Sequence, residues 1–102
     1  MASAILSGEF ASAGETSDWI TLRGEYNLSL SGGEGTVELE KSYDGGLTVF
    51  SVSKNTDGDP ASYALTSGDK LSLVGIEPES GVLYRLNCPA YTSGTIIYRI
   101  SQ

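Results

Sequence analysis

The stretch EYNLSLS at residues 25–31 decides the fold class. It places Tyr26, Leu28 and Leu30 at every second position, with polar residues between them. Successive side chains of a β-strand point to opposite faces, so this alternation is typical of a strand with one buried face and one wet face. The spacing of three and four residues that marks an amphipathic helix is missing here. We therefore predict a strand whose apolar face is turned toward a core.

The same alternation recurs along the chain, and turn signals rich in glycine and aspartate separate the runs. Runs near 5–10, 19–22 and 48–53 bring the total to about eight short strands. We predict an all-β fold, an antiparallel β-sandwich of Ig-like or jelly-roll-like type in a single domain. The expected inward positions are Val37, Leu39, Leu71, Leu73, Val82, Tyr84, Leu86, Cys88, Ile96, Tyr98 and Ile100.

The N-terminal residues differ in composition from the rest. Residues 2–18 are rich in Ala, Ser and Gly, and their large apolar side chains are Ile5, Leu6 and Phe10. Two interpretations of residues 1–18 stay open. They form an ordinary first strand that closes the sandwich of residues 19–102, or an arm that adds to the sheet edge of a neighbour or lies along a host surface.

Charge and composition exclude several classes of function. The 102 residues carry 6 Lys plus Arg against 13 Asp plus Glu, a formal net charge of −7. This balance argues against nucleic acid and against an anionic membrane surface as partners. The chain has no histidine and one cysteine, which removes the usual general base and any internal disulfide. No basic cluster precedes an apolar run near Met1, so we expect no secretory signal.

Candidate catalytic and metal sites are weak. The oxygen-rich stretch 55–59 departs from the EF-hand pattern and is typical of a solvated turn. Glu38 and Glu40 share the expected wet face of a strand, and Glu77 and Glu79 flank Pro78 in an expected loop. Neither pair is placed to flank a substrate as glycosidase carboxylates do. We predict no enzyme activity, no cofactor and no metal site.

Trp19 allows two interpretations, whereas Cys88 has a single expected role. Trp19 is the only tryptophan, and its face in the strand pattern is ambiguous. It is either an anchor in the core or at a protein interface, or a platform that stacks on a sugar ring. Cys88 continues an inward face, so we expect it to be a small buried apolar residue.

Two parts of the chain resemble a known group of proteins. The first is 19–32 (WITLRGEYNLSLSG) with 35–46 (GTVELEKSYDGG), and the second is 81–86 (GVLYRL) with 91–102 (YTSGTIIYRISQ). Together they resemble small β-sandwich structural proteins of the virions of tailed bacteriophages and prophages. A shorter match to GTV and SYDGG also occurs in galactose-binding-like sandwiches, although Leu47 to Phe50 stand where a second tryptophan is often found there.

The resemblance implies a non-enzymatic virion component, assembled in the bacterial host cytoplasm. The preferred role is capsid decoration on the outer surface of the head, as a trimer bound to the major capsid protein or another virion protein. A glycan-binding module on the phage surface and a neck or tail accessory protein are the alternatives. The expected interface residues are Ile5, Leu6, Phe10 and Trp19.

Overall fold

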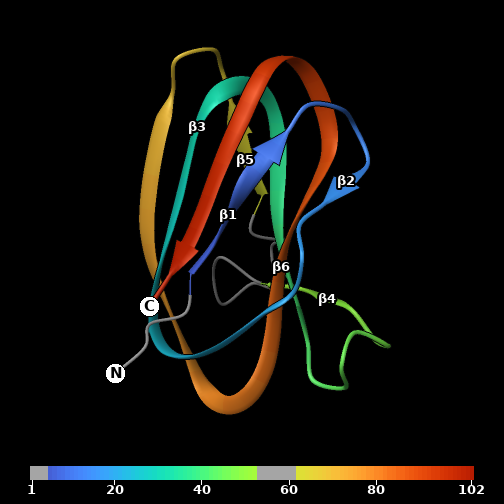
Figure 1. Ribbon diagram of the computed structural model, residues 1–102, viewed down its shortest axis with the longest axis vertical. Coiled ribbons are helices and arrows are strands. Elements are labelled where there is room, and N and C mark those ends of the chain that lie inside the picture. The colour runs from blue at the N-terminus through green and yellow to red at the C-terminus, as the bar shows by residue number, and fades with distance from the viewer. Residues whose placement is uncertain (1–4, 53–61) are drawn as a thin grey trace.

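A computed structural model describes residues 5–52 and 62–102. Six strands make up its regular structure: β1 (Ile5–Phe10), β2 (Glu15–Thr16), β3 (Ile20–Ser42), β4 (Phe50–Ser51), β5 (Ser62–Leu65) and β6 (Lys70–Ser101) (Figure 1). All the pairings between them are antiparallel. The described residues contain no helix, and so none that could cross a membrane. The predicted all-β antiparallel fold class is confirmed.

The two long strands double back on themselves, which Figure 1 shows as broad bends at both ends of the molecule. β3 bends at Gly32, where φ is 101° and a side chain would collide with the carbonyl oxygen of Thr95. Only glycine fits such a position, because it tolerates positive φ and leaves room for the neighbouring backbone. β6 bends near Gly81 and again near Gly94. Each long strand therefore supplies several straight segments, which is why six strands replace the expected eight or so.

One group of segments forms the first layer. β1 pairs with 96–101, which pairs with the early part of β3, and that part pairs on its other side with 70–77. In Figure 1 these segments lie side by side as blue, red, teal and yellow-orange ribbons. β1, the first described strand, lies at one edge of this layer.

The remaining segments form the second layer. Its central segment, 82–88, pairs on one side with β2 and residues 20–22, and on the other side with 38–42. The later part of β3 then pairs with β5 and with β4. The two layers are consistent with the predicted sandwich.

The core lies between the layers. The rings of Tyr26 in the first layer and Tyr84 in the second lie 5.2 Å apart between centroids. The alternation predicted for 25–31 is confirmed, because Tyr26, Leu28 and Leu30 are at most 4% exposed. The other buried apolar residues are Phe10, Leu22, Val37, Leu39, Leu65, Val82, Tyr84, Leu86, Cys88, Ile96, Tyr98 and Ile100.

Three expectations need correction or fall outside the structure. Of the strand expected at 48–53, the described residues form only the short strand Phe50–Ser51, followed by one further backbone hydrogen bond from the Val52 N–H to the Leu39 carbonyl at 3.0 Å. Glu77 does not lie in an exposed loop: it is 2% exposed and faces inward. The oxygen-rich stretch 55–59 lies outside the described residues.

Candidate functional site

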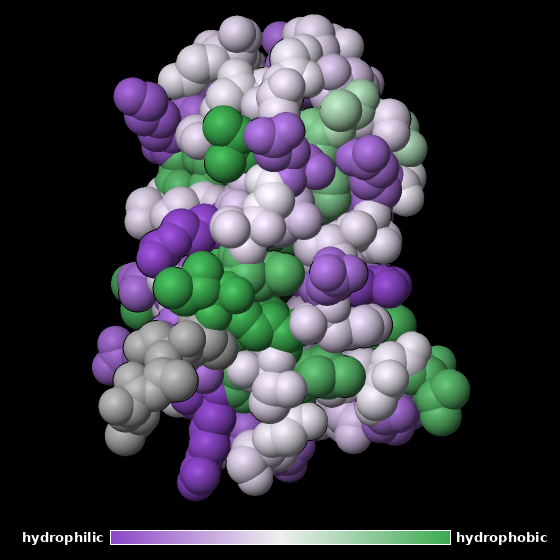
Figure 2. Space-filling model, viewed as in Figure 1, coloured by the Kyte–Doolittle hydropathy of each residue, from purple (hydrophilic) through white to green (hydrophobic). Residues whose placement is uncertain are grey.

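Several exposed apolar side chains lie on the segment that follows β3. Figure 2 shows one face of the molecule coloured by hydropathy, with hydrophobic residues in green. Tyr43 and Phe50 are each about half exposed, their rings meet edge to face at 5.9 Å, and Leu47 is 89% exposed. With Val49, these residues form what we call the loop surface, defined as Tyr43, Leu47, Val49 and Phe50. Large contiguous apolar patches on protein surfaces mark binding sites, which makes this surface the candidate site of the molecule.

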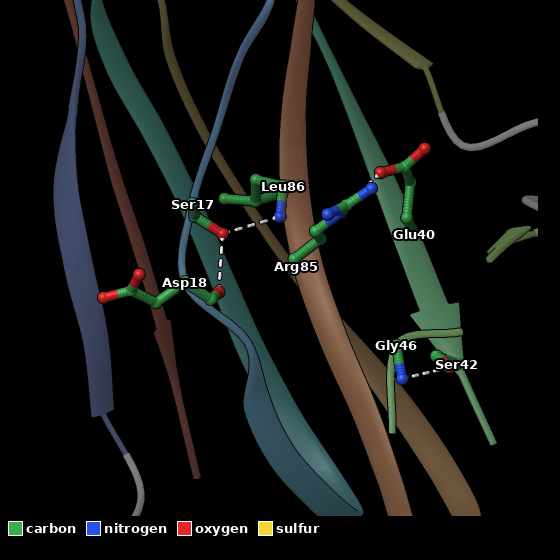
Figure 3. A network of polar contacts seen from close by, with 7 residues as sticks. All are labelled: Ser17, Asp18, Glu40, Ser42, Gly46, Arg85 and Leu86. Carbon is green, nitrogen blue, oxygen red and sulfur yellow. Dashed lines mark hydrogen bonds and ion pairs between the residues drawn. The ribbon is translucent and has the colours of Figure 1, made fainter. Parts of the chain in front are cut away.

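A set of hydrogen bonds fixes the loop that carries this surface. The Oδ1 atom of Asp44 accepts from the Ser42 hydroxyl at 2.7 Å and from the backbone N–H of Thr48 at 2.8 Å. The Ser42 oxygen in turn accepts from the N–H of Gly46 at 2.9 Å (Figure 3). These bonds, from the Thr48 side chain and backbone and then from Ser42, lower the pKa of Asp44 to about 2. The carboxylate is therefore charged at neutral pH and holds the loop in one shape.

Trp19 lies beside this loop, between the loop and a charged pair. The guanidinium carbon of Arg85 sits over the indole ring, 4.5 Å from its centroid, and Arg85 Nε donates to Glu40 Oε1 at 2.9 Å (Figure 3 shows the ion pair). A Cβ atom on Gly46 would come within 3.2 Å of the indole nitrogen, so the loop backbone lies close against the ring. Trp19 is half-buried, and one face of its ring is already occupied by a cation.

The carboxylate of Glu77 is buried in the core, within reach of Lys41, whose Nζ also lies over the Tyr43 ring of the loop surface. Glu77 Oε1 accepts from the Tyr84 hydroxyl at 2.6 Å and lies 3.4 Å from Lys41 Nζ, while Oε2 accepts from the N–H of Glu79 at 3.0 Å. Burial alone would raise the pKa of Glu77, but these hydrogen bonds and the lysine outweigh it and hold the pKa below its usual range. Burial and Glu77 also raise the pKa of Tyr84 far above its usual range.

The Glu77 cluster has the properties of a structural tie. Every polar atom of the carboxylate has a donor, and no buried side-chain nitrogen or oxygen among the described residues lacks a partner. Such a group has no proton poised for transfer near neutral pH. Sequence reasoning missed Glu77 because Pro78 suggested a loop. The alternation of Leu71, Leu73 and Gly75 carried forward by two positions points Glu77 inward.

The residues predicted to form an interface are not gathered in one place. Ile5 is 58% exposed on the outer face of β1, whereas Leu6 is half-buried against the core. Phe10 is 1% exposed and packs on Tyr98 with 4.7 Å between ring centroids. An interface that used Phe10 would require β1 to leave its own sheet. Trp19 contacts second-layer neighbours, away from these first-layer residues.

The loop surface was not predicted from the sequence. Two of its residues, Val49 and Phe50, belong to the run expected as a strand at 48–53, in which they lie on opposite faces. The sequence signal at this segment is Asp44-Gly45-Gly46, which predicts a turn and also belongs to the stretch that resembles the virion proteins, and neither observation indicates an exposed apolar surface.

The carboxylates near the loop surface are engaged by other side chains of the chain. Within 5–52 and 62–102, no group of three His, Cys, Asp or Glu side chains is placed to hold a metal ion. Glu40 is engaged by Arg85 and Glu77 by Tyr84 and Lys41. Comparisons of the chain with protein-family models, with curated proteins and with solved structures found no match.

Proposed function

We propose that this chain is a non-enzymatic structural protein of a bacteriophage virion, most specifically a capsid decoration protein on the outer surface of the head. The loop surface carries the proposal, because four apolar side chains are held in a fixed loop where they face water. Burying such side chains against another protein stabilises a complex by roughly 25 cal/mol per Å² of apolar area before association costs. The resemblance of 19–46 and 81–102 to virion sandwich proteins supplies the class of partner.

The charge of the chain supports an outer position. A net charge of −7 would be repelled by packaged DNA inside a capsid, but it is tolerated on the outside. Close to the loop surface, Lys41 Nζ lies 5.2 Å from the Tyr43 ring centroid and Arg85 lies over Trp19, and both cations are paired with carboxylates, Lys41 with Glu77 and Arg85 with Glu40.

Cosedimentation with empty capsids that lack the protein tests the proposal. The wild-type chain is expected to pellet with capsids at saturating, symmetric stoichiometry. Leu47→Ser is expected to weaken binding about tenfold or more, because a fully buried leucine contributes about 1.5–3 kcal/mol. Ile97→Ser is the matched control, because Ile97 is an exposed apolar residue on the other layer.

Quantitative gel analysis of purified virions separates the possible positions. Hundreds of copies per particle would agree with decoration, and a single ring of copies would indicate a neck or tail accessory protein instead. A chain that is absent from virions, or that pellets equally well with Leu47→Ser, would overturn the proposal.

A further inference from the structure

The first layer has two strand edges that pair on one side only. Among the described residues, β1 pairs only with 96–101, and the 70–77 segment pairs only with 24–31. An unpaired strand edge presents a row of backbone N–H and C=O groups, which are complementary to another β-strand. Both edges are therefore suited to bind an extended chain through backbone hydrogen bonds.

Three rows of side chains cross the outer face of this layer from one edge to the other. The register places four residues level with one another in each row. Each row begins on β1 and ends on the 70–77 segment with a side chain of matching character: apolar with apolar, hydroxyl with hydroxyl, and acid with base. The rows are Ile5, Ser101, Asn27 and Val74; Ser7, Arg99, Ser29 and Ser72; and Glu9, Ile97, Ser31 and Lys70.

We propose that these two edges pair with each other between copies of this chain, with β1 of one copy adding antiparallel to the 70–77 segment of the next. The directions agree, because the strands of the layer alternate from β1 to 70–77 and the next β1 continues that alternation. With the rows kept level, Ile5 lies opposite Val74, Ser7 opposite Ser72 and Glu9 opposite Lys70. Directly opposed pairs of these kinds stabilise antiparallel sheets.

Burial on the inner side supports the same register. Leu6, Leu71 and Leu73 are partly buried and pack against the edges of the core. In this register Leu6 of one copy lies opposite Leu73 of the next, so each copy covers apolar surface that the other leaves partly open. Ile5 and Val74, 58% and 63% exposed in the single chain, are covered on the outer side.

Pairing each edge with its own copy fits less well. An antiparallel β1 pair centred on Ser7 would oppose Ile5 to Glu9. A pair of 70–77 segments centred on Leu73 would oppose Lys70 to Ile76, again a charge against an apolar side chain. The contact is therefore head to tail, and the twist between copies decides whether it closes a ring or extends a filament. This self-association goes beyond the proposed function and needs no capsid.

Sedimentation velocity and light scattering of the purified full chain, from about micromolar to millimolar concentration, test the inference. The wild-type chain is expected to form oligomers as the concentration rises. Glu9→Lys and Lys70→Glu are each expected to raise the dissociation constant about tenfold, since attraction becomes repulsion at the interface. Circular dichroism checks that both variants fold, as expected for exposed side chains.

Mixing the two variants gives the decisive result. Where β1 of the Glu9→Lys variant meets the 70–77 segment of the Lys70→Glu variant, the acid and the base have exchanged places and attract each other again. The opposite contact, between β1 of the Lys70→Glu variant and the 70–77 segment of the Glu9→Lys variant, keeps the original pair. The equimolar mixture is therefore expected to assemble like wild type. Asp18→Lys, an exposed position with the same change of charge, is expected to leave assembly unchanged.

Hydrogen exchange gives an independent measurement. Amides of β1 and of 70–77 are expected to gain protection with concentration, while those of β5 do not. A monomer at every concentration, charge reversals without effect, or a mixture that stays dissociated would each overturn the inference.

Discussion

Replacing Tyr84 by phenylalanine tests whether the buried Glu77 carboxylate ties the layers together. The substitution removes the hydroxyl that donates to Glu77 Oε1 at 2.6 Å and leaves the ring, which is 1% exposed, in place. A hydrogen bond to a charged group contributes about 1.5–3 kcal/mol, and the buried carboxylate loses one of its donors. We expect Tyr84→Phe to lower the free energy of unfolding by about 2 kcal/mol, which is about 10 °C in Tm for a chain of this size.

The loss should depend on pH in a defined direction. The pKa of Glu77 is lower in the folded chain than its ordinary value, so the stability that it contributes is present above the unfolded pKa. That stability is lost as pH falls through the folded pKa. The difference between wild type and Tyr84→Phe should therefore be largest at neutral pH and shrink below about pH 4.

Urea unfolding followed by circular dichroism at pH 7 and pH 3 measures both effects. Tyr91→Phe is the control, because the Tyr91 hydroxyl donates to the carbonyl of Gly94 at an exposed site. The reasoning fails if Tyr84→Phe costs no more than Tyr91→Phe at pH 7, or if its cost is the same at both pH values. An unchanged m-value is required for the comparison to report stability alone.

Three further predictions concern single residues. Gly75→Ala should cost about 1–3 kcal/mol in thermal unfolding, because a Cβ atom at 75 would overlap the buried ring of Tyr26. Asp44→Ala should speed hydrogen exchange of the Thr48 amide, and wild type should show the same increase only as pH falls through about 2, where Asp44 takes up a proton. The Cys88 thiol, which is buried with a pKa raised mainly by that burial, should not react with thiol reagents until urea unfolds the chain.

Each of these predictions has a result that would contradict it. Ser72→Ala is the control for Gly75→Ala on the same segment, and equal costs would show that Tyr26 does not crowd position 75. If Asp44→Ala leaves the hydrogen-exchange rate of the Thr48 amide unchanged, the Asp44 carboxylate does not hold the loop in its shape. Rapid labelling of Cys88 in the folded chain would show that its end of β6 opens readily.

The sequence predicted the parts of the fold that depend on local alternation. Tyr26, Leu28 and Leu30 are buried as the EYNLSLS pattern requires, because a period of two leaves one choice of inward face. The site was harder to predict, since it depends on partners far apart in the chain. The position of Trp19 follows from Arg85 on β6 and from the loop at Gly46, and neither contact is visible in the residues next to it.

Two failures have a more specific cause. Glu77 precedes Pro78, and proline usually marks a loop or a strand edge. The loop was therefore predicted, although the alternation along the segment places Glu77 in the core, where it is buried. Phe50 lies in an alternating run with Val52, but Phe50 is 48% exposed whereas Val52 is partly buried against the core, so the two residues of one face differ in how far they are covered. Periodicity predicts which residues share a face, whereas tertiary pairing decides whether that face is covered.

The way β3 and β6 each run through both layers has a consequence for how the chain acquires its structure. Residues 96–101 form an inner strand between β1 and β3, so the first layer is incomplete until this late part of the sequence has been synthesised. During synthesis β1 therefore has no hydrogen-bonding neighbour in its layer until residues 96–101 have been made. We expect folding of this kind to be slow, because the strand segments that must pair lie far apart in the sequence.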